Sequence, residues 1–495
     1  MKTGFDSNLY ASLQREQILS RVEAAKGRLY MEFGGKLLDD YHAARVLPGF
    51  DPAGKIKLLQ TLSTQTEILL CINSSDIEKN KQRSDIGITY ELDVLRLMEF
   101  LRSMGLYVSA VVITQYDGQA AADTFRKKLE QSGERVFIHR FTKGYPTDIE
   151  TIVSEEGYGA NPYIPVTRPL VVVTAPGPGS GKLATCLSQM YHEFQQGHES
   201  GYAKFETFPV WSLPLNHPVN LAYEAATADL DDVNMIDPFH LEAYGTTAVN
   251  YNRDVEVFPI LRTILQRITQ SDDIYKSPTD MGVNVIGKCV IDDEALQYAA
   301  RQEILRRYFS TRQSYKLGRI DVSAVNKIEM ILSRLNLKLE DRAVVAPALQ
   351  KSKDTGGPAV AIQLPDGSIV TGRTTEVMSA PAAALINAIK KLSGIRERIH
   401  LISPSILNPI IKLKSQTFHL RNPILNLEEV LVALSISAVT NPLVEHAMES
   451  LASLRGCEAH ASYMLPSGDE KTLMKLEVNL TCEPMYPSKN LYYEW

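Results

Sequence analysis

Short apolar runs alternate with amphipathic segments through the first 215 residues of the chain. The runs are rich in β-branched and aromatic residues, as strands are, and they cover residues 28–33, 66–72, 107–114, 135–141 and 169–175. Between them lie charged segments whose apolar residues recur at helical spacing, such as 88–105. Near-continuous apolar strands alternating with amphipathic helices predict a parallel sheet covered on both faces. We therefore expect a doubly wound α/β domain over residues 1–215.

Two further units follow. Prolines break the start of residues 216–340, and the rest of that stretch is strongly helical, so we expect a mainly helical unit there. Residues 341–495 predict a C-terminal α+β domain. Its expected elements are a hairpin turning at Asp366-Gly367, an alanine-rich helix, a strand at 398–403, helices at 425–439 and 441–455, and strands near 457–465 and 471–482. A chain of 495 residues is too long for one core, which agrees with several units.

The order of elements in the C-terminal domain resembles the cytidine-deaminase-like arrangement. In that family the first helix starts with His or Cys and has Glu two residues later, and a later turn carries P-C-x-x-C. The matching stretches here read MSAPAAAL (378–385) and SPSILNP (403–409), which hold none of these side chains. We expect a deaminase-like fold without zinc ligands or deaminase chemistry. For this domain we expect either a packing role or a dimerisation role, the latter as a homodimer formed through it.

Charge and composition narrow the function classes. The chain has 52 Lys and Arg against 58 Asp and Glu, and this net charge of -6 gives no overall attraction for nucleic acid or an anionic membrane. No stretch approaches 18 uninterrupted apolar residues, and the N-terminus lacks the apolar region of a signal peptide, so we expect a cytoplasmic protein. The five cysteines are scattered without metal-ligand spacing, which predicts buried thiols and no metal site.

A glycine-rich stretch, PGPGSGK (176–182), directly follows the strand predicted at 169–175. Its glycines can take positive φ and let backbone amides converge on one anion, toward which the next helix would direct its positive end. Lys182 would add a full charge. The stretch resembles the phosphate loop of nucleotide-binding proteins, and GPGSGK is similar to the version in adenylate kinases. We expect a small phosphorylated ligand here, with ATP or another nucleotide and Mg²⁺ as candidate cofactors. The candidate binding residues are Gly177, Gly179, Ser180, Gly181 and Lys182.

The stretch also departs from the G-x-x-x-x-G-K-[ST] pattern. The first glycine falls at Pro176, and the hydroxyl that binds magnesium falls at Leu183. These differences disfavour P-loop hydrolysis more than anion binding, and a tight strand-to-helix turn stays open as the alternative. A second glycine turn, Gly34-Gly35-Lys36, follows the first strand and could bind the ligand at the same edge of the sheet. The alternative is that Lys36 is only a solvated residue at a helix start.

Residues 205–245 open with a predicted sixth strand that ends near Trp211 and continue as a polar segment. Four prolines divide this stretch into turns. His217 and His240 with Asp237 form a candidate catalytic acid/base set, because imidazole titrates near neutral pH and a carboxylate can fix its tautomer. The same residue types bind divalent metals, but their spacing matches no metal motif, and helix capping explains much of the pattern. The candidate substrate contacts are Asn220 in this segment and Thr279 and Asp280 farther along, for which capping is again the alternative.

The whole chain resembles a bacterial family catalogued as domain of unknown function 1846, also called uncharacterised protein family 371. The resemblance is carried by APGPGSGKLATCLSQMYHE (175–193), FPVWSLPLNHPVNLAYEAATADL (208–230), MIDPFH (235–240) and SPTDMGVN (277–284). Members have been labelled ATP-dependent peptidases, but this chain has no zinc-protease helix motif, and Ser180 lacks the G-x-S-x-G context. The resemblance implies membership over the full length and assigns no catalytic residue. Two classes stay open: an enzyme acting on the phosphorylated ligand, and a sensor that binds it and transmits occupancy to the C-terminal domain.

Overall fold

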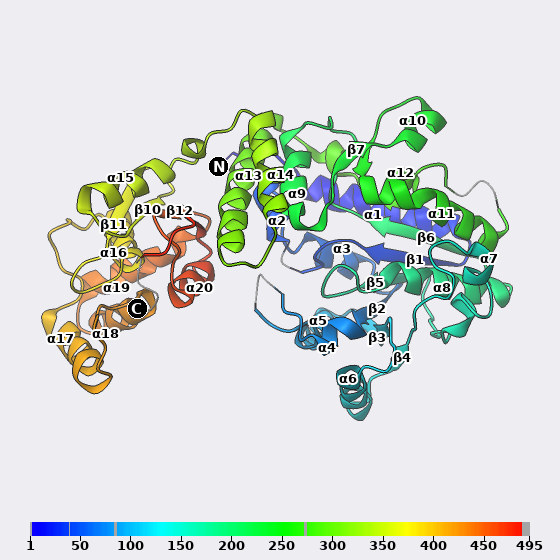
Figure 1. Cartoon of the computed structure of the whole chain (residues 1–495), viewed down its shortest axis with the longest axis horizontal. Helices are drawn as coiled ribbons and strands as arrows, with labels where there is room; N and C mark the ends of the chain where they lie inside the picture. The colour runs from blue at the N-terminus through cyan, green and yellow to red at the C-terminus, as the bar shows by residue number, and fades with distance from the viewer. Residues whose placement is uncertain (1, 39, 84–86, 272–274, 488–495) are drawn as a thin grey trace. The chain divides into compact units, whose positions relative to one another are not determined.

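The computed structural model describes residues 2–38, 40–83, 87–271 and 275–487 (Figure 1). Contacts between residues divide the chain into two compact units. The first takes in Met1–Glu224 and Asp232–Ala300, and the second takes in Ala225–Asp231 and Arg301–Trp495. The stretch 216–340, predicted as a helical unit, supplies elements to both.

A seven-stranded parallel sheet forms the centre of the first unit, with the strand order β4-β3-β2-β5-β1-β6-β9. The strands are β1 (Arg28–Phe33), β2 (Thr66–Asn73), β3 (Tyr107–Thr114), β4 (Val136–Ile138), β5 (Leu170–Thr174), β6 (Ser200–Phe205) and β9 (Gly282–Val283). The first five lie in the predicted apolar runs, so the predicted parallel α/β sheet is confirmed. The sixth strand was placed wrongly: β6 ends at Phe205, before Pro209 and Pro214, which cannot donate to a strand ladder.

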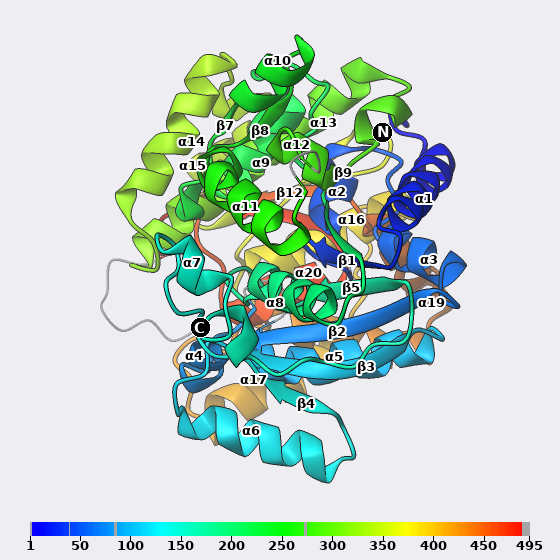
Figure 2. The same cartoon turned by 90° about the vertical axis from the view of Figure 1, so that its right-hand side faces the viewer.

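Helices cover both faces of this sheet, which explains why its strands are apolar throughout. Every residue of β5 is buried. Val173 belongs to a core shared with α8 (Lys182–Gln195) and α11 (Asn252–Thr269), two helices that Figure 2 shows on the same side of the sheet. Helices α1 (Ser7–Ala24) and α5 (Tyr90–Ser103) also pack on its strands. Parallel strands buried on both faces have no polar side, as the near-continuous runs predicted.

The connections that leave β2 and β5 run in opposite directions along the sheet. β2 continues to β3 and β4 toward one edge, whereas β5 continues to β6 and β9 toward the other. Neighbouring strands whose connections diverge in this way leave a crevice beyond their carboxyl ends, and open α/β sheets bind ligands there. The glycine stretch 176–182 follows β5, so the topology places it at this switch point.

The rest of the first unit consists of short elements. They are the helices α2 (Tyr41–Val46), α3 (Gly54–Thr61), α4 (Ser74–Glu78), α6 (Ala120–Gln131), α7 (Ile149–Ile152), α9 (Pro218–Ala226), α10 (Pro238–Tyr244) and α12 (Pro278–Met281), the 3-10 turns η1 (Tyr158–Ala160) and η3 (Ile286–Cys289), and the antiparallel pair β7 (Asn234–Ile236) and β8 (Val249–Tyr251). Helices α9 and α13 (Asp293–Lys316) each begin in the first unit and end in the second.

The second unit contains a mixed sheet with the order β11-β10-β12-β13. Its strands are β10 (Ala359–Gln363), β11 (Ile369–Arg373), β12 (Glu458–Ala461) and β13 (Asn479–Cys482). β10 is antiparallel to both neighbours, and β12 is parallel to β13. The helices and turns are η2 (Ala228–Leu230), α14 (Val322–Arg334), η4 (Leu339–Asp341), α15 (Val345–Thr355), α16 (Ala380–Leu392), α17 (Pro404–Lys412), the π-helical turn η5 (Leu413–Thr417), α18 (Leu427–Ala438), α19 (Pro442–Glu449), η6 (Ser450–Leu454) and α20 (Ser467–Lys475).

Two predicted strands of the second unit were wrong. Residues 398–403 form no strand; Leu401 and Ile402 are buried in the core from an irregular turn, so their apolar character reflects burial alone. The strand predicted over 471–482 is a helix as far as Lys475 and a strand only from Asn479. Short apolar runs do not separate these outcomes, because a buried turn, helix and strand need the same residues.

Three sequence expectations concern the chain as a whole. All five cysteines are unpaired and buried, as predicted. Across the described ranges, no helix combines the length and apolar character that crossing a bilayer requires. In the same ranges, no three His, Cys, Asp or Glu side chains gather closely enough to bind a metal ion together.

Candidate functional site

The loop 176–182 leads from β5 into α8 without a side-chain cap. Its N-cap residue is Gly181, in the left-handed conformation with φ of 77°. The first hydrogen bond of the helix runs from the Thr185 amide to the Gly181 carbonyl, at 3.0 Å. Among the described residues, the loop amides and the first three amides of α8 donate to no protein acceptor. Unbonded amides at a helix N-terminus carry partial positive charge and suit an anion.

Two side chains from neighbouring strand ends hold this loop by its carbonyl groups. Asn73 Nδ2 donates to the Gly179 carbonyl at 3.1 Å, and Thr114 Oγ1 donates to the Ser180 carbonyl at 2.7 Å. A trans peptide places its N–H and C=O on opposite sides. The amides of Ser180 and Gly181 therefore point away from Asn73 and Thr114, and so away from the ends of β2 and β3.

Close neighbours leave no room for side chains at two of the loop glycines. A Cβ on Gly177 would lie 2.3 Å from the Tyr90 hydroxyl, and a Cβ on Gly181 would lie 2.8 Å from Thr114 Oγ1. Gly179, by contrast, has open space around it, although its φ of 71° also favours glycine. The repeated glycines are thus required by close packing as well as by backbone conformation.

Lys182 is directed back over the loop toward the end of β1. Its Nζ lies 3.5 Å from Ser180 Oγ and 3.6 Å from Glu32 Oε1, and its side chain is 12% exposed. Both distances are long for hydrogen bonds, so the ammonium has donors to offer a ligand. The positive charge expected of Lys182 is nevertheless partly neutralised by the nearby Glu32 carboxylate. The other oxygen of Glu32 accepts a hydrogen bond from the Tyr202 hydroxyl at 3.0 Å.

In the first turn of α8, the residue after Lys182 is apolar and has no hydroxyl group. Leu183 lines the pocket described below, and Thr185 is fully buried with its hydroxyl 3.5 Å from Cys71 Sγ. In P-loop proteins the residue after the lysine supplies the hydroxyl that binds Mg²⁺. This loop therefore offers an anion backbone amides and one ammonium, without that hydroxyl.

The second glycine turn follows β1. The Gly34 amide is already bonded to the Phe205 carbonyl at 3.0 Å, and the Lys36 side chain is exposed. The interior cation here is Lys55, which is 1% exposed and which the sequence analysis missed. Its Nζ lies 2.8 Å from Asp40 Oδ2 and 3.0 Å from the Lys36 carbonyl. The binding role predicted for Gly34, Gly35 and Lys36 stays a prediction.

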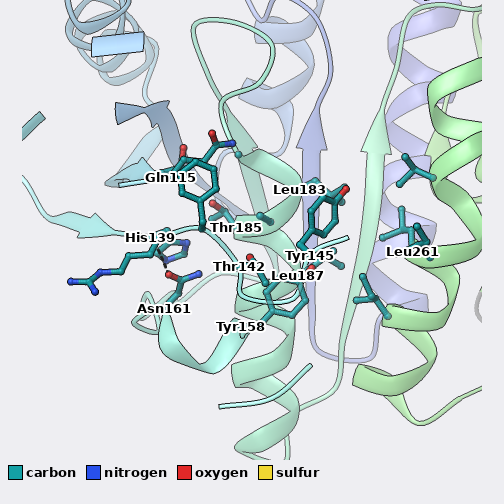
Figure 3. A pocket seen from close by; sticks show the side chains of 18 residues that line it. Gln115, His139, Thr142, Tyr145, Tyr158, Asn161, Leu183, Thr185, Leu187 and Leu261 are labelled. Carbon is teal, nitrogen blue, oxygen red and sulfur yellow. Dashed lines mark hydrogen bonds between the residues drawn. The ribbon is translucent and has the colours of Figure 1, made fainter. Parts of the chain in front are cut away.

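A pocket of about 350 Å³ lies beside Gly181 on the α8 side of the sheet (Figure 3). Its apolar walls come from α8 and α11 and consist of Leu183, Leu187, Val257, Ile260, Leu261 and Ile264. Polar side chains at the end of β3 and in the segment 139–161 complete it, namely Thr114, Gln115, His139, Arg140, Thr142 and Asn161. Among the described residues that line this pocket, none is Asp or Glu. Its volume and lining are those of a small-molecule site.

His139 is the buried polar group of this pocket. The residue is 3% exposed, and its Nε2 has no hydrogen-bond partner among the described residues. Burial lowers the pKa of His139 to about 4, with His192 acting in the same direction and the Pro162 backbone opposing it. The imidazole is therefore neutral at pH 7. Buried polar groups without partners are uncommon in proteins and call for an explanation, such as a missing ligand.

Replacing His139 with Phe should reduce the pH dependence of stability. An unfolded His binds a proton near pH 6.5, whereas the folded pKa is about 4, so stability is complete above pH 6.5 and falls as the pH drops toward 4. The wild type should lose about 2 kcal/mol between pH 7 and pH 5 through this group, and H139F should not. Urea unfolding at both pH values measures this. An equal loss in H139F, or a reduced loss in the exposed-histidine control H446F, would contradict the expectation.

The predicted acid/base set does not form one hydrogen-bonded group. His217 precedes α9; its Nε2 lies 3.0 Å from Asp293 Oδ1, and its Nδ1 accepts from the Val219 amide at 3.3 Å. Burial lowers the pKa of His217, while Asp293 opposes that effect. Among the described residues, no hydrogen bond joins His217 to Asp237 or His240.

Asp237 and His240 lie together at the start of α10, but their imidazole and carboxylate are not paired. Asp237 Oδ1 accepts from the amides of Phe239 and His240, both at 3.0 Å, and its Oδ2 accepts from Thr279 Oγ1 at 2.7 Å. His240 Nδ1 lies 3.2 Å from Ser277 Oγ. Asp237 thus caps a helix and ties α10 to α12, as the capping alternative expected; its catalytic role stays a prediction.

The predicted substrate contacts also make bonds within the protein. Asn220 Oδ1 accepts from the Val210 amide at 2.8 Å, which fixes the segment after β6. Asp280 forms a reciprocal capping box with Ser277 at the start of α12. Thr279 bonds to Asp237, as described above. Ligand binding by Asn220, Thr279 and Asp280 stays a prediction.

A partly buried charged cluster at the end of β6 was missed by the sequence analysis. Lys204 Nζ lies 2.7 Å from Glu206 Oε1 and is also paired with Asp254 in the first turn of α11. Burial raises the pKa of Glu206, although Lys204 acts in the opposite direction. The signal in the sequence was that Lys204 and Glu206 are two residues apart, so that both side chains lie on the same face of the sheet. This pattern does not differ from the polar end of an ordinary strand.

The first unit is an α/β domain with a parallel sheet whose connections diverge where the glycine loop lies. Domains of this kind carry a ligand crevice at such a switch point. The chain belongs to the family described as domain of unknown function DUF1846. The N-terminal model of that family matches residues 3–336, and its C-terminal model matches residues 340–492. The resemblance stated from the sequence is thereby confirmed.

Relatives of the chain cover its whole length. The UPF0371 protein of Clostridium botulinum (strain Alaska E43 / Type E3) is 55% identical over 501 residues, which is 100% of both chains. The UPF0371 protein of Clostridium tetani shows the same identity and coverage, and that of Clostridioides difficile (strain 630) is 54% identical, again over 100% of both chains. These names give a family and no activity.

Proposed function

We propose that the first unit binds the phosphate group of a small phosphorylated molecule at the loop 176–182. The observation that carries this proposal is the orientation of the loop: Asn73 and Thr114 hold its carbonyls, so that the amides of Ser180 and Gly181 face away from the strand ends. A helix start with unbonded amides and a nearby lysine is a general anion-binding arrangement.

Binding without Mg²⁺ is the form of this proposal that the side chains favour. The position of the magnesium-binding hydroxyl holds Leu183, and Thr185 is turned into the core. Mg²⁺-ATP, the other candidate, would need metal ligands from elsewhere on the chain.

A sensor is favoured over an enzyme by the contacts of the predicted catalytic residues. His217 is paired with Asp293, and Asp237 serves as a cap, so that both side chains already have structural partners. An enzyme that handles phosphate esters is the second candidate, for which the partly buried cluster of Lys204, Glu206 and Asp254 offers acid/base groups.

Ribose 5-phosphate is a suitable first probe. We expect it to stabilise the first unit against heat to the same extent with and without Mg²⁺; at 100 times its Kd, the gain is about 2.7 kcal/mol. The variant K182A should weaken this effect at least tenfold in Kd, because one ammonium donor is lost. The matched control is K127A, at an exposed lysine of α6. No stabilisation by ribose 5-phosphate, or equal binding by K182A and wild type, would refute the loop as an anion site.

We also infer a deaminase-like arrangement without zinc chemistry for the second unit. β10 is antiparallel to both its neighbours and begins a hairpin followed by α16, in keeping with that fold. The start of α16 holds Ser379 and Ala380, where zinc ligation would need His or Cys. A homodimer formed through this unit stays a prediction.

A further inference from the structure

We propose that the phosphorylated ligand is a nucleoside monophosphate, whose phosphate binds the loop 176–182 and whose base enters the pocket beside Gly181. This inference rests on the proposed function and adds the chemical class of the ligand. Gly181, Leu183 and Ala184 belong to the helix start and also line the pocket. A phosphate bound at the Leu183 and Ala184 side of this helix start therefore has its next groups at the pocket.

The interior of the pocket suits a flat, largely apolar ring. Leu187 of α8 and Leu261 and Ile264 of α11 form its walls, and Tyr158, 1% exposed, lies among them (Figure 3). A sugar phosphate alone would leave these apolar side chains against water, whereas a base would cover them.

Two polar groups distinguish a base from a hydrocarbon chain. His139 Nε2 is buried in the pocket wall without a partner among the described residues. Asn161 is 3% exposed; its Oδ1 accepts from the Arg140 amide at 2.8 Å, which leaves Nδ2 to donate. The edge of a nucleobase offers ring nitrogens, carbonyl oxygens or amino groups to such a pair, and an alkyl chain offers none. Buried polar groups thus favour a base over a lipid-like ligand.

Exposed aromatic rings stand at the rim of the same pocket. Phe141 is 63% exposed and Tyr145 is 53% exposed, and both line it from the segment that follows β4. Large aromatic side chains left in water at the rim of a pocket are typical of sites where a ligand ring stacks. The described lining also lacks carboxylates, so a bound anion meets no like charge from it.

Isothermal titration with ligands that share one phosphate separates the base from the loop. We expect at least one of AMP, GMP, CMP and UMP to bind at least 30-fold more tightly than ribose 5-phosphate. If ribose 5-phosphate binds as tightly as all four nucleotides, the inference about the base is overturned while the proposed function stands. If ribose 5-phosphate does not bind, the proposed function is overturned, and the inference that rests on it falls with it.

Two pocket variants place the base. H139F removes Nε2 with little change in size, and F141A removes an exposed aromatic ring from the pocket rim, which should not affect folding. Each should weaken the preferred nucleotide at least tenfold and leave ribose 5-phosphate unchanged. H446F, at an exposed histidine of α19, should change neither. If H139F and F141A bind the nucleotide as wild type does, or weaken ribose 5-phosphate equally, the base does not occupy this pocket.

Discussion

Replacing Gly181 with Ala should raise the Kd for ribose 5-phosphate at least 100-fold. The new Cβ would lie 2.8 Å from both Cβ and Oγ1 of Thr114, closer than such atoms approach in proteins. Thr114 would then have to move, and with it the hydrogen bond that fixes the Ser180 carbonyl. Once that peptide rotates, the Gly181 amide no longer faces a bound anion. Backbone strain at a φ of 77° adds about 1 kcal/mol.

The same helix provides a matched control. Gly197 lies just beyond the C-terminal end of α8 with an identical φ of 77°, but a Cβ there meets nothing within 4 Å. G197A should therefore carry the backbone strain alone, about 1 kcal/mol, and should bind ribose 5-phosphate as wild type does. Titration and thermal unfolding of both variants compare the two sites. Binding by G181A within threefold of wild type would show that the loop does not hold the phosphate as described.

Replacing Arg342 with Met should destabilise the second unit by about 4 kcal/mol. Arg342 is fully buried, and its guanidinium donates to Thr481 Oγ1 at 2.9 Å and to the carbonyls of Ala459 and Asn479 at 3.0 and 2.7 Å. It also pairs with Glu458. Methionine fills similar volume but leaves two strand-end carbonyls and a largely buried carboxylate without this donor, and such losses are costly.

Urea unfolding measures the effect of R342M. A probe that reports on the second unit, such as hydrogen exchange in β12 and β13, monitors the transition. Glu458 keeps a bond from Arg306 at 2.8 Å, so the variant should still fold, at lower stability. The control is R334M, at an exposed arginine in the last turn of α14, which should change stability by less than about 0.5 kcal/mol. A loss below 1 kcal/mol in R342M would mean that this network contributes little.

The strands of the first sheet could be predicted because their environment is uniform. β1 and β3 occupy the residues expected for them, since a strand covered on both faces must be apolar at nearly every position. The C-terminal unit was harder. Ile399, Leu401 and Ile402 are apolar because a turn carries them into the core, and a one-dimensional pattern does not distinguish that turn from a strand.

Of the candidate site, too, one part could be predicted from the sequence and another could not. The glycine loop was visible because a left-handed N-cap and close approaches by Tyr90 and Thr114 both require glycine. His139 gave no comparable signal: it directly follows the short edge strand β4, and only the segment folded over it makes the position buried. Lys55 gave no signal in the sequence either, because it is buried beside Asp40, which lies on a separate segment and pairs with it at 2.8 Å.

The sequence alone determined the parallel sheet, the glycine loop at a strand end and membership of the family, because each depends on local residue order and spacing. Tertiary structure decided which groups meet at that loop: Asn73, Thr114 and Glu32 come from three other strands. It also decided that His217 pairs with Asp293 rather than with Asp237, and that a pocket lies beside Gly181. Hydrogen bonds and burial act over a few ångströms in space, and the fold alone sets which distant residues come within that range.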